Sequence, residues 1–268
     1  MSTQSVPATL PKPYCATVGF SDIESSNTVG YNTDTITAKK FNMLAVPFEG
    51  TDGDGFKLND CFSGVNLTGT DSPFTADQIQ IWDAATGVYD NWFFYDVGDE
   101  FTGWWDEGTG ESLFEDVYPH GLPAGTAFWY KSPSSASANG SSTVSGQVPG
   151  AADIEVEILK GKFNMVSFPY PTALKLNDTS AVDWSKATGT DSAYTADQIQ
   201  IWDPASGTYD NWFYYNVGDE YTGWWDEGTG ESLFEDVYAN GLAVGKPFWY
   251  KAAGSTGTFD VKFMNPVK

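Results

Sequence analysis

The sequence predicts an all-β protein with two tandem homologous antiparallel β-sandwich or barrel domains and an extended N-terminal arm. Three observations support this fold class. A segment of fifty residues is nearly repeated further along the chain. Several short segments alternate apolar and polar residues at period two, as strands do. No segment keeps a convincing period of 3.6 over ten or more residues, so we expect at most single helical turns, near residues 75–77 or 112–116.

The repeated segment is a tandem duplication. Residues 69–118 align without a gap with residues 189–238 at an offset of 120, and they differ at only eight of fifty positions. Within this match the block GWWDEGTGESLFEDVY is identical in the two copies. A function carried by this segment should therefore occur twice.

The chain of 268 residues is long enough for two ordinary cores. We predict an N-terminal arm over residues 1–27, a first β domain over 28–149 and a second over 150–268. The arm is rich in proline and β-branched residues, which suits a strand added to the sheet edge of a neighbouring subunit.

Each predicted domain has about six to eight short strands. Residues 41–48 match residues 163–170, and the proline in each places the strand at a sheet edge or marks the strand's exit. Further strands are expected around residues 128–131 and 248–251 and around Val144, Gly146, Val148, Ile154, Val156, Ile158, Phe259, Val261 and Phe263. Residues 132–142 are rich in small residues and are predicted to form a loop.

A β-hairpin is predicted inside the repeat. Residues 78–82 alternate polar and apolar side chains, residues 83–87 read as a turn, and an aromatic run ends at Tyr95. In the second copy the turn carries Pro204 and Gly207, which suits a type I turn closed by a glycine at positive φ.

The net charge of −23 makes several partners implausible. The chain has thirteen Lys and no Arg against thirty-six acidic residues, so it would repel a phosphate backbone. We therefore predict no nucleic-acid partner. No run of eighteen apolar residues occurs, so we also predict no membrane insertion.

We interpret the acidic surface as a solvated coat of an exported protein, at the cell surface or extracellular. The N-terminus lacks the charged start and apolar stretch of a signal peptide. This permits a cytosolic protein or a mature exported form, and we expect the second.

The two cysteines, Cys15 and Cys61, predict a disulfide between the arm and the first domain. Thr179 replaces Cys61 in the second copy, so Cys61 is not needed for the domain core. The bond would stabilise the fold by about 4 kcal/mol on a chain-entropy estimate. Two unpaired thiols are the alternative.

The identical block supplies the candidate ligand- or partner-binding residues. An aromatic ring beside carboxylates suits a sugar, because the ring stacks on its C–H face and the carboxylate accepts hydroxyl hydrogen bonds. Neighbouring residues of a strand point to opposite faces, so at most one Trp of each pair is core and the other is free for a ligand. The alternative is that both tryptophan rings of each pair serve only to cover the core of their domain and bind nothing. The candidates are Trp104, Trp105, Asp106, Glu107 and Glu111 in one copy and Trp224, Trp225, Asp226, Glu227 and Glu231 in the other.

Catalysis and metal binding have weaker signals. Paired carboxylates would suit a glycoside hydrolase, with Glu107 and Glu227 as equivalent candidate acids in the two copies, but any acidic chain offers such pairs, and we predict no enzyme. The single histidine, His120, aligns with Asn240 and could act in only one copy. Oxygen ligands in residues 96–100 and 106–111 leave calcium as the one possible cofactor.

The repeated motifs FNM..PF, ADQIQIWD and FWYK resemble modules of uncharacterised secreted or surface-anchored bacterial proteins. The resemblance implies an all-β extracellular building unit, and it covers both domains but not the arm. It implies no functional residue.

From the sequence we therefore favour an extracellular structural protein, a self-assembling surface or filament subunit. A tandem carbohydrate-binding module is the alternative, with glycans as partners in place of further copies of the chain. An acid-pair glycoside hydrolase is the second alternative.

Overall fold

The computed structural model describes residues 29–50, 55–58, 62, 67–98, 100–110, 112–133, 140–150, 152–218 and 220–266. The described elements include short antiparallel strands and the single-turn helices α2 (Phe114–Val117) and α3 (Phe234–Val237). The predicted all-β sandwich architecture is confirmed. The domain boundaries at residues 27 and 149 stay predictions.

Each half of the chain contains one five-stranded sheet, and the strand order is the same in both halves. In the first half it runs β2-β6-β3-β4-β5, and in the second β9-β14-β11-β12-β13. The strands of the first sheet are β2 (Phe41–Ala45), β3 (Gln78–Asp83), β4 (Val88–Tyr95), β5 (Gly103–Asp106) and β6 (Ala127–Lys131). Those of the second are β9 (Phe163–Val166), β11 (Gln198–Asp203), β12 (Thr208–Tyr215), β13 (Gly223–Asp226) and β14 (Phe248–Lys251).

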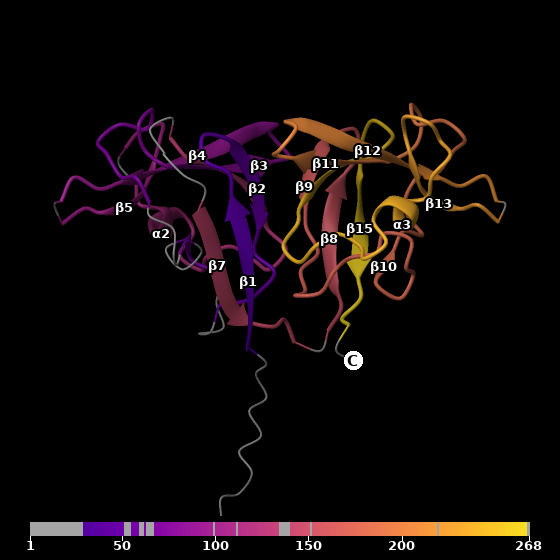
Figure 1. The fold of residues 1–268 in the computed structure, drawn as a ribbon, viewed down its shortest axis with the longest axis horizontal. Coiled ribbons are helices and arrows are strands. Elements are labelled where there is room, and N and C mark those ends of the chain that lie inside the picture. The colour runs from indigo at the N-terminus through magenta and orange to yellow at the C-terminus, as the bar shows by residue number, and fades with distance from the viewer. Residues whose placement is uncertain are drawn as a thin grey trace, which may run out of the picture.

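A smaller sheet covers the inner face of each five-stranded sheet. In the first half β1 (Val29–Ile36) pairs with β7 (Gly140–Gln147). In the second half β15 (Thr258–Phe263) lies between β8 (Ile154–Leu159) and β10 (Val182–Asp183). In Figure 1 the five-stranded sheets lie along the upper side of the molecule and the small sheets lie below them.

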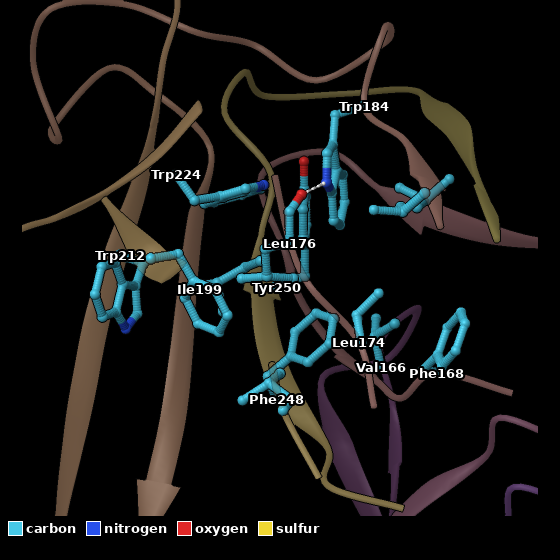
Figure 2. Close-up of a cluster of buried hydrophobic side chains, with 14 of the residues drawn as sticks. Val166, Phe168, Leu174, Leu176, Trp184, Ile199, Trp212, Trp224, Phe248 and Tyr250 are labelled. Atoms are coloured by element: carbon cyan, nitrogen blue, oxygen red, sulfur yellow. Dashed lines mark hydrogen bonds between the residues drawn. The ribbon is translucent and has the colours of Figure 1, made fainter. Parts of the chain in front are cut away.

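Aromatic side chains fill the space between the two layers. In the second half Trp184 stacks on Tyr250 with ring centroids 5.7 Å apart and meets Trp224 edge-on at 5.1 Å. The indole N–H of Trp184 donates to the carbonyl of Leu176 (2.7 Å), and Figure 2 shows this bond inside the cluster. Burying such large rings removes much apolar surface from water, which stabilises the packing of the two layers.

The predicted hairpin is confirmed as β3 and β4, with Trp82 opposite Tyr89. Gly87 and Gly207 close the two copies of its turn at φ values of 75° and 73°. The strands with proline at their exits, β2 and β9, are edge strands that end before the proline, also as predicted.

One predicted loop is shorter than expected. We expected a loop over residues 132–142, but β7 begins at Gly140 and Ser142 pairs with Asp34 of β1. Small residues favour loops, yet pairing with a long partner strand satisfies their backbone groups equally well. Residues 134–139 lie outside the described part of the chain.

The two halves contact each other through the outer faces of their five-stranded sheets. Trp82 of β3 donates its indole N–H to the carbonyl of Phe163 in β9 (2.7 Å). Trp202 of β11 donates in turn to the carbonyl of Phe41 in β2 (3.0 Å). We call this contact the junction; its other buried or half-buried members are Met43, Tyr89, Trp129, Met165 and Trp249.

Candidate functional site: two aromatic hollows

The outer face of each five-stranded sheet is aromatic beyond the junction. Along β4, Trp92 belongs to the core cluster, and by strand alternation Phe93 and Tyr95 point away from it. In the neighbouring strand β5, Trp105 stands directly opposite Phe93. Three rings from two strands therefore meet on the side of the sheet that the small sheet does not cover.

These rings line a hollow of about 310 Å³ in each half. The first is lined by Asp71, Phe93, Tyr95, Phe101, Trp105 and Gly110. The second is lined by the equivalent Asp191, Phe213, Tyr215, Tyr221, Trp225 and Gly230. Of the six aligned pairs, only Phe101 and Tyr221 differ, and they differ by one hydroxyl group.

Local contacts hold the tryptophan ring of each hollow in place. The indole N–H of Trp105 donates to the carbonyl of Phe101 (2.8 Å), and Trp225 donates likewise to Tyr221 (2.8 Å). Tyr95 meets the Trp105 ring edge-on at 6.3 Å. A ring fixed in this way loses little conformational entropy when a ligand stacks on it.

One aromatic ring in the lining of each hollow is largely exposed, and so is a second ring in a neighbouring part of the sequence. Phe101 and Tyr221 are 54% and 56% exposed. In the loop that also carries the lining aspartate, Phe74 and Tyr194 are 85% and 94% exposed. Each of these two positions is aromatic in both copies, although the residue before the first of them differs, Pro73 against Ala193. Exposed rings at the same positions of both copies indicate a contact surface.

Each hollow has one carboxylate in its lining. Asp71 and Asp191 are exposed, and neither makes a hydrogen bond or ion pair with a described residue. Their oxygens are therefore available as hydrogen-bond acceptors at the edge of an aromatic surface.

The predicted tryptophan pairs divide as strand alternation requires. Trp104 and Trp224 are fully buried in the two cores, so they cannot touch a ligand. Trp105 and Trp225 are half-buried and line the hollows. Of the four candidate tryptophans, these two remain as site residues.

The predicted acidic residues lie outside the hollow linings. Asp106 accepts the backbone N–H of Thr109 (2.6 Å), and Asp226 accepts the backbone N–H and hydroxyl of Thr229 (2.9 and 2.6 Å). The Thr229 hydrogen bonds hold the pKa of Asp226 below its ordinary value. These two carboxylates therefore shape the turns after β5 and β13 and are not directed at a ligand.

The described candidate glutamates also lie outside the hollow linings. Glu107 and Glu227 are half-buried, and their backbone N–H groups pair with Asn91 and Asn211 (2.9 and 3.0 Å). Glu231 is exposed. Glu111 lies outside the described residues.

Within the described residues, no group of three or more His, Cys, Asp or Glu side chains is placed to hold a metal ion. Asp96, in one of the two loops considered for calcium, is replaced by Asn216 in the second copy, and the replacement has a simple geometric basis. Each side-chain Oδ1 accepts a backbone N–H, from Gly98 (3.0 Å) and Gly218 (3.2 Å). An amide oxygen does this as well as a carboxylate, so the position does not require charge.

Several site residues were not identified from sequence. Phe93, Tyr95, Phe101 and Asp71, with their second-half equivalents, were not among the candidates, because an aromatic run in a strand is usually core. The sequence did carry one signal: consecutive aromatic residues in a strand must place rings on both faces of the sheet, and only one face can be core. Cys15 and Cys61 both lie outside the described residues, so the disulfide stays a prediction.

Comparisons with protein-family models, curated proteins and solved structures gave no match to this chain. Separately, the described helices are all too short to cross a membrane.

Proposed function

We propose that this protein is a tandem carbohydrate-binding protein that holds glycan in the two aromatic hollows. The observation that carries the proposal is the repetition of one arrangement. In each half a half-buried tryptophan, fixed by its indole hydrogen bond, adjoins an exposed ring and a carboxylate that pairs with no described residue.

The arrangement matches the two chemical faces of a sugar ring. The C–H face is apolar and stacks on an aromatic ring, and the hydroxyl groups at the rim donate to a carboxylate. Trp105 with Phe101 would supply the first contact and Asp71 the second.

The charge of the chain narrows the class of glycan. A protein with net charge −23 and a carboxylate in each hollow repels uronic acids and sulfated sugars. We infer that the ligand is neutral or cationic, and that the protein acts outside the cell, where such polymers are displayed.

Among the candidate acids of the identical block, Asp226 suits binding better than hydrolysis. A glycosidase needs one carboxyl with a raised pKa facing a second carboxylate across the scissile bond. Asp226 has a lowered pKa and is engaged in a turn, which is the opposite of what a general acid requires.

Self-assembly is the second candidate function. It is favoured by the exposure of Phe74 and Tyr194, because strongly exposed aromatic rings at the same position of both copies suit contact with another chain. Sedimentation at high concentration separates the candidates: a filament subunit assembles without glycan, whereas a glycan-binding protein stays monomeric until polymer is added.

Glycan binding is tested by pairing Trp105→Ala with Trp225→Ala. We expect wild type to bind immobilised neutral or cationic glycans on an array and the double variant to lose at least tenfold in affinity, because both stacking platforms are gone. Phe101→Ala with Tyr221→Ala removes rings that are about half exposed, so it should weaken binding with little effect on folding.

Tyr31→Ala is the matched control, since this tyrosine is 77% exposed on β1, outside the lining of either hollow. Unchanged binding by the double variant, or an array on which wild type binds nothing, contradicts the proposal.

A further inference from the structure

The contacts at the junction are reciprocal. Trp82 of the first half bonds Phe163 of the second at 2.7 Å, and Trp202 of the second bonds Phe41 of the first at 3.0 Å. A contact in which each half offers the same residues to the other is the mark of a twofold axis.

The aromatic packing at the junction repeats the same symmetry. Trp82 meets Trp249 at 5.5 Å with the rings 90° apart. Trp202 meets Trp129 at 5.6 Å with the rings 86° apart. The two halves are therefore related by an approximate twofold axis. Rotation about it places each residue of the first copy on the equivalent residue of the second.

The two hollows are related by the same approximate axis, because each is built on strands that pair with the strands of the junction. Trp82 lies on β3, and β3 pairs along its length with β4, which carries Phe93 of the hollow. Only one strand boundary separates the junction from each hollow, so the hollows take the same symmetry. Figure 1 shows β5 and β13, the outer strands of the hollows, at opposite ends of the molecule.

A twofold axis has a consequence for a directional polymer. The line that joins two symmetry-related points is perpendicular to the axis, and the rotation reverses every direction perpendicular to it. A linear glycan has a reducing and a non-reducing end. A straight chain that crossed both hollows would therefore enter the second one backwards, although the two linings are nearly identical.

We propose that the two hollows bind two separate glycan chains in opposite directions, so that the protein cross-links polysaccharide. This inference rests on the proposed glycan binding and adds the geometry of its use. Two sites along one strand would raise the affinity for that strand, whereas two sites of opposite polarity join different strands into a network.

The test uses the full chain with four soluble polymers: hydroxyethylcellulose, galactomannan, arabinoxylan and chitosan. Retarded migration in polymer-containing native gels reports binding, and light scattering of the mixture reports cross-linking. One-hollow variants are Phe101→Ala with Trp105→Ala and, as the matched pair, Tyr221→Ala with Trp225→Ala.

We expect wild type to be retarded by at least one polymer and to raise its scattering at least tenfold at intermediate protein-to-polymer ratios, with a fall when protein is in excess. Each one-hollow variant should still be retarded but should leave the scattering at the level of polymer alone. Calorimetry with a twelve-sugar oligosaccharide of the bound polymer should give two oligosaccharides per protein.

Two results distinguish a failure of the proposed glycan binding from a failure of the proposed cross-linking. If wild type is retarded by none of the polymers, the proposed glycan binding is wrong and cross-linking falls with it. If wild type binds but scattering stays flat, or one oligosaccharide occupies both hollows, binding stands and the cross-linking geometry is overturned.

Discussion

One residue difference changes the hydrogen bonding of a buried aspartate in the two copies. Asp197 is fully buried and accepts the backbone N–H of Ala253 through Oδ1 (2.6 Å), the N–H of Thr188 (3.0 Å) and the hydroxyl of Tyr250. Its equivalent Asp77 is 1% exposed, and its Oδ1 has no partner among the described residues. The residue aligned with Ala253 is Pro133, which has no N–H to donate.

Ala253→Pro should remove this bond. We expect the free energy of unfolding to fall by about 1–3 kcal/mol, since a buried charged acceptor loses a donor. The reverse change, Pro133→Ala, offers Asp77 a donor and should be neutral or stabilise by up to about 1 kcal/mol, because the added chain entropy of the unfolded state offsets part of the gain.

Urea unfolding at several pH values separates the lost bond from backbone strain. Burial raises the pKa of Asp197, and losing the Ala253 donor raises it further. The loss caused by Ala253→Pro should therefore grow as pH rises through this pKa, whereas strain would give a loss that is the same at every pH.

Two buried asparagines connect the small sheet to the five-stranded sheet in each half. Asn42, at the start of β2, accepts from Thr37 N (2.7 Å) and donates to the carbonyls of Thr37 (3.1 Å) and Lys40 (3.0 Å). Asn164 makes the same three contacts in the turn before β9, with Leu159 N (2.9 Å) and the carbonyls of Leu159 (3.1 Å) and Lys162 (3.2 Å). One amide side chain thus satisfies three backbone groups where the chain passes from one layer to the other.

Asn164→Ala should lower the free energy of unfolding by about 2–3 kcal/mol, because several buried backbone groups lose their partner together. Asn42→Ala is the matched change in the first half and should act in the same direction. Chemical denaturation measures both effects, and losses under about 0.5 kcal/mol in both variants would show that water replaces the side chain without penalty.

At the scale of the whole molecule, charge as well as aromatic packing crosses the junction. Lys246 of the second half donates to the carbonyl of Trp202 (2.7 Å), and its charge acts on Asp34 of the first half. Burial raises the pKa of Asp34 to about 6, although the Asn32 hydrogen bond and Lys246 oppose this. Burial also lowers the pKa of Lys246.

A raised carboxyl pKa destabilises the folded state once the group ionises. The contribution of Asp34 to stability is fully present below its unfolded pKa of 3.8 and is lost as pH rises through about 6. Asp34→Asn should therefore match wild type near the lower value and exceed it by about 1–2 kcal/mol at neutral pH. Thermal unfolding across this range measures the difference.

Thr33→Ala, which removes an exposed uncharged side chain of the same strand, is the control, and its difference from wild type should be the same at every pH. A constant offset between Asp34→Asn and wild type would mean that the amide acts through packing and not through ionisation.

The sequence by itself determined what depends on neighbouring residues. The alternation of strand side chains put the two tryptophans of each pair on opposite faces of the sheet, and turn chemistry placed Gly207 at positive φ. The duplication showed that each such feature occurs twice. These properties follow from local backbone geometry, which a short segment carries wherever it lies in the fold.

The tertiary structure alone decided which side chains meet. Phe93 reaches Trp105 only through the register of β4 and β5, and Asp71 joins them from a separate loop. Trp82 and Trp202 find their carbonyl partners 81 and 161 residues away. Such contacts depend on how sheets pair and stack, and alternation within one strand carries no information about the strand that will lie against it.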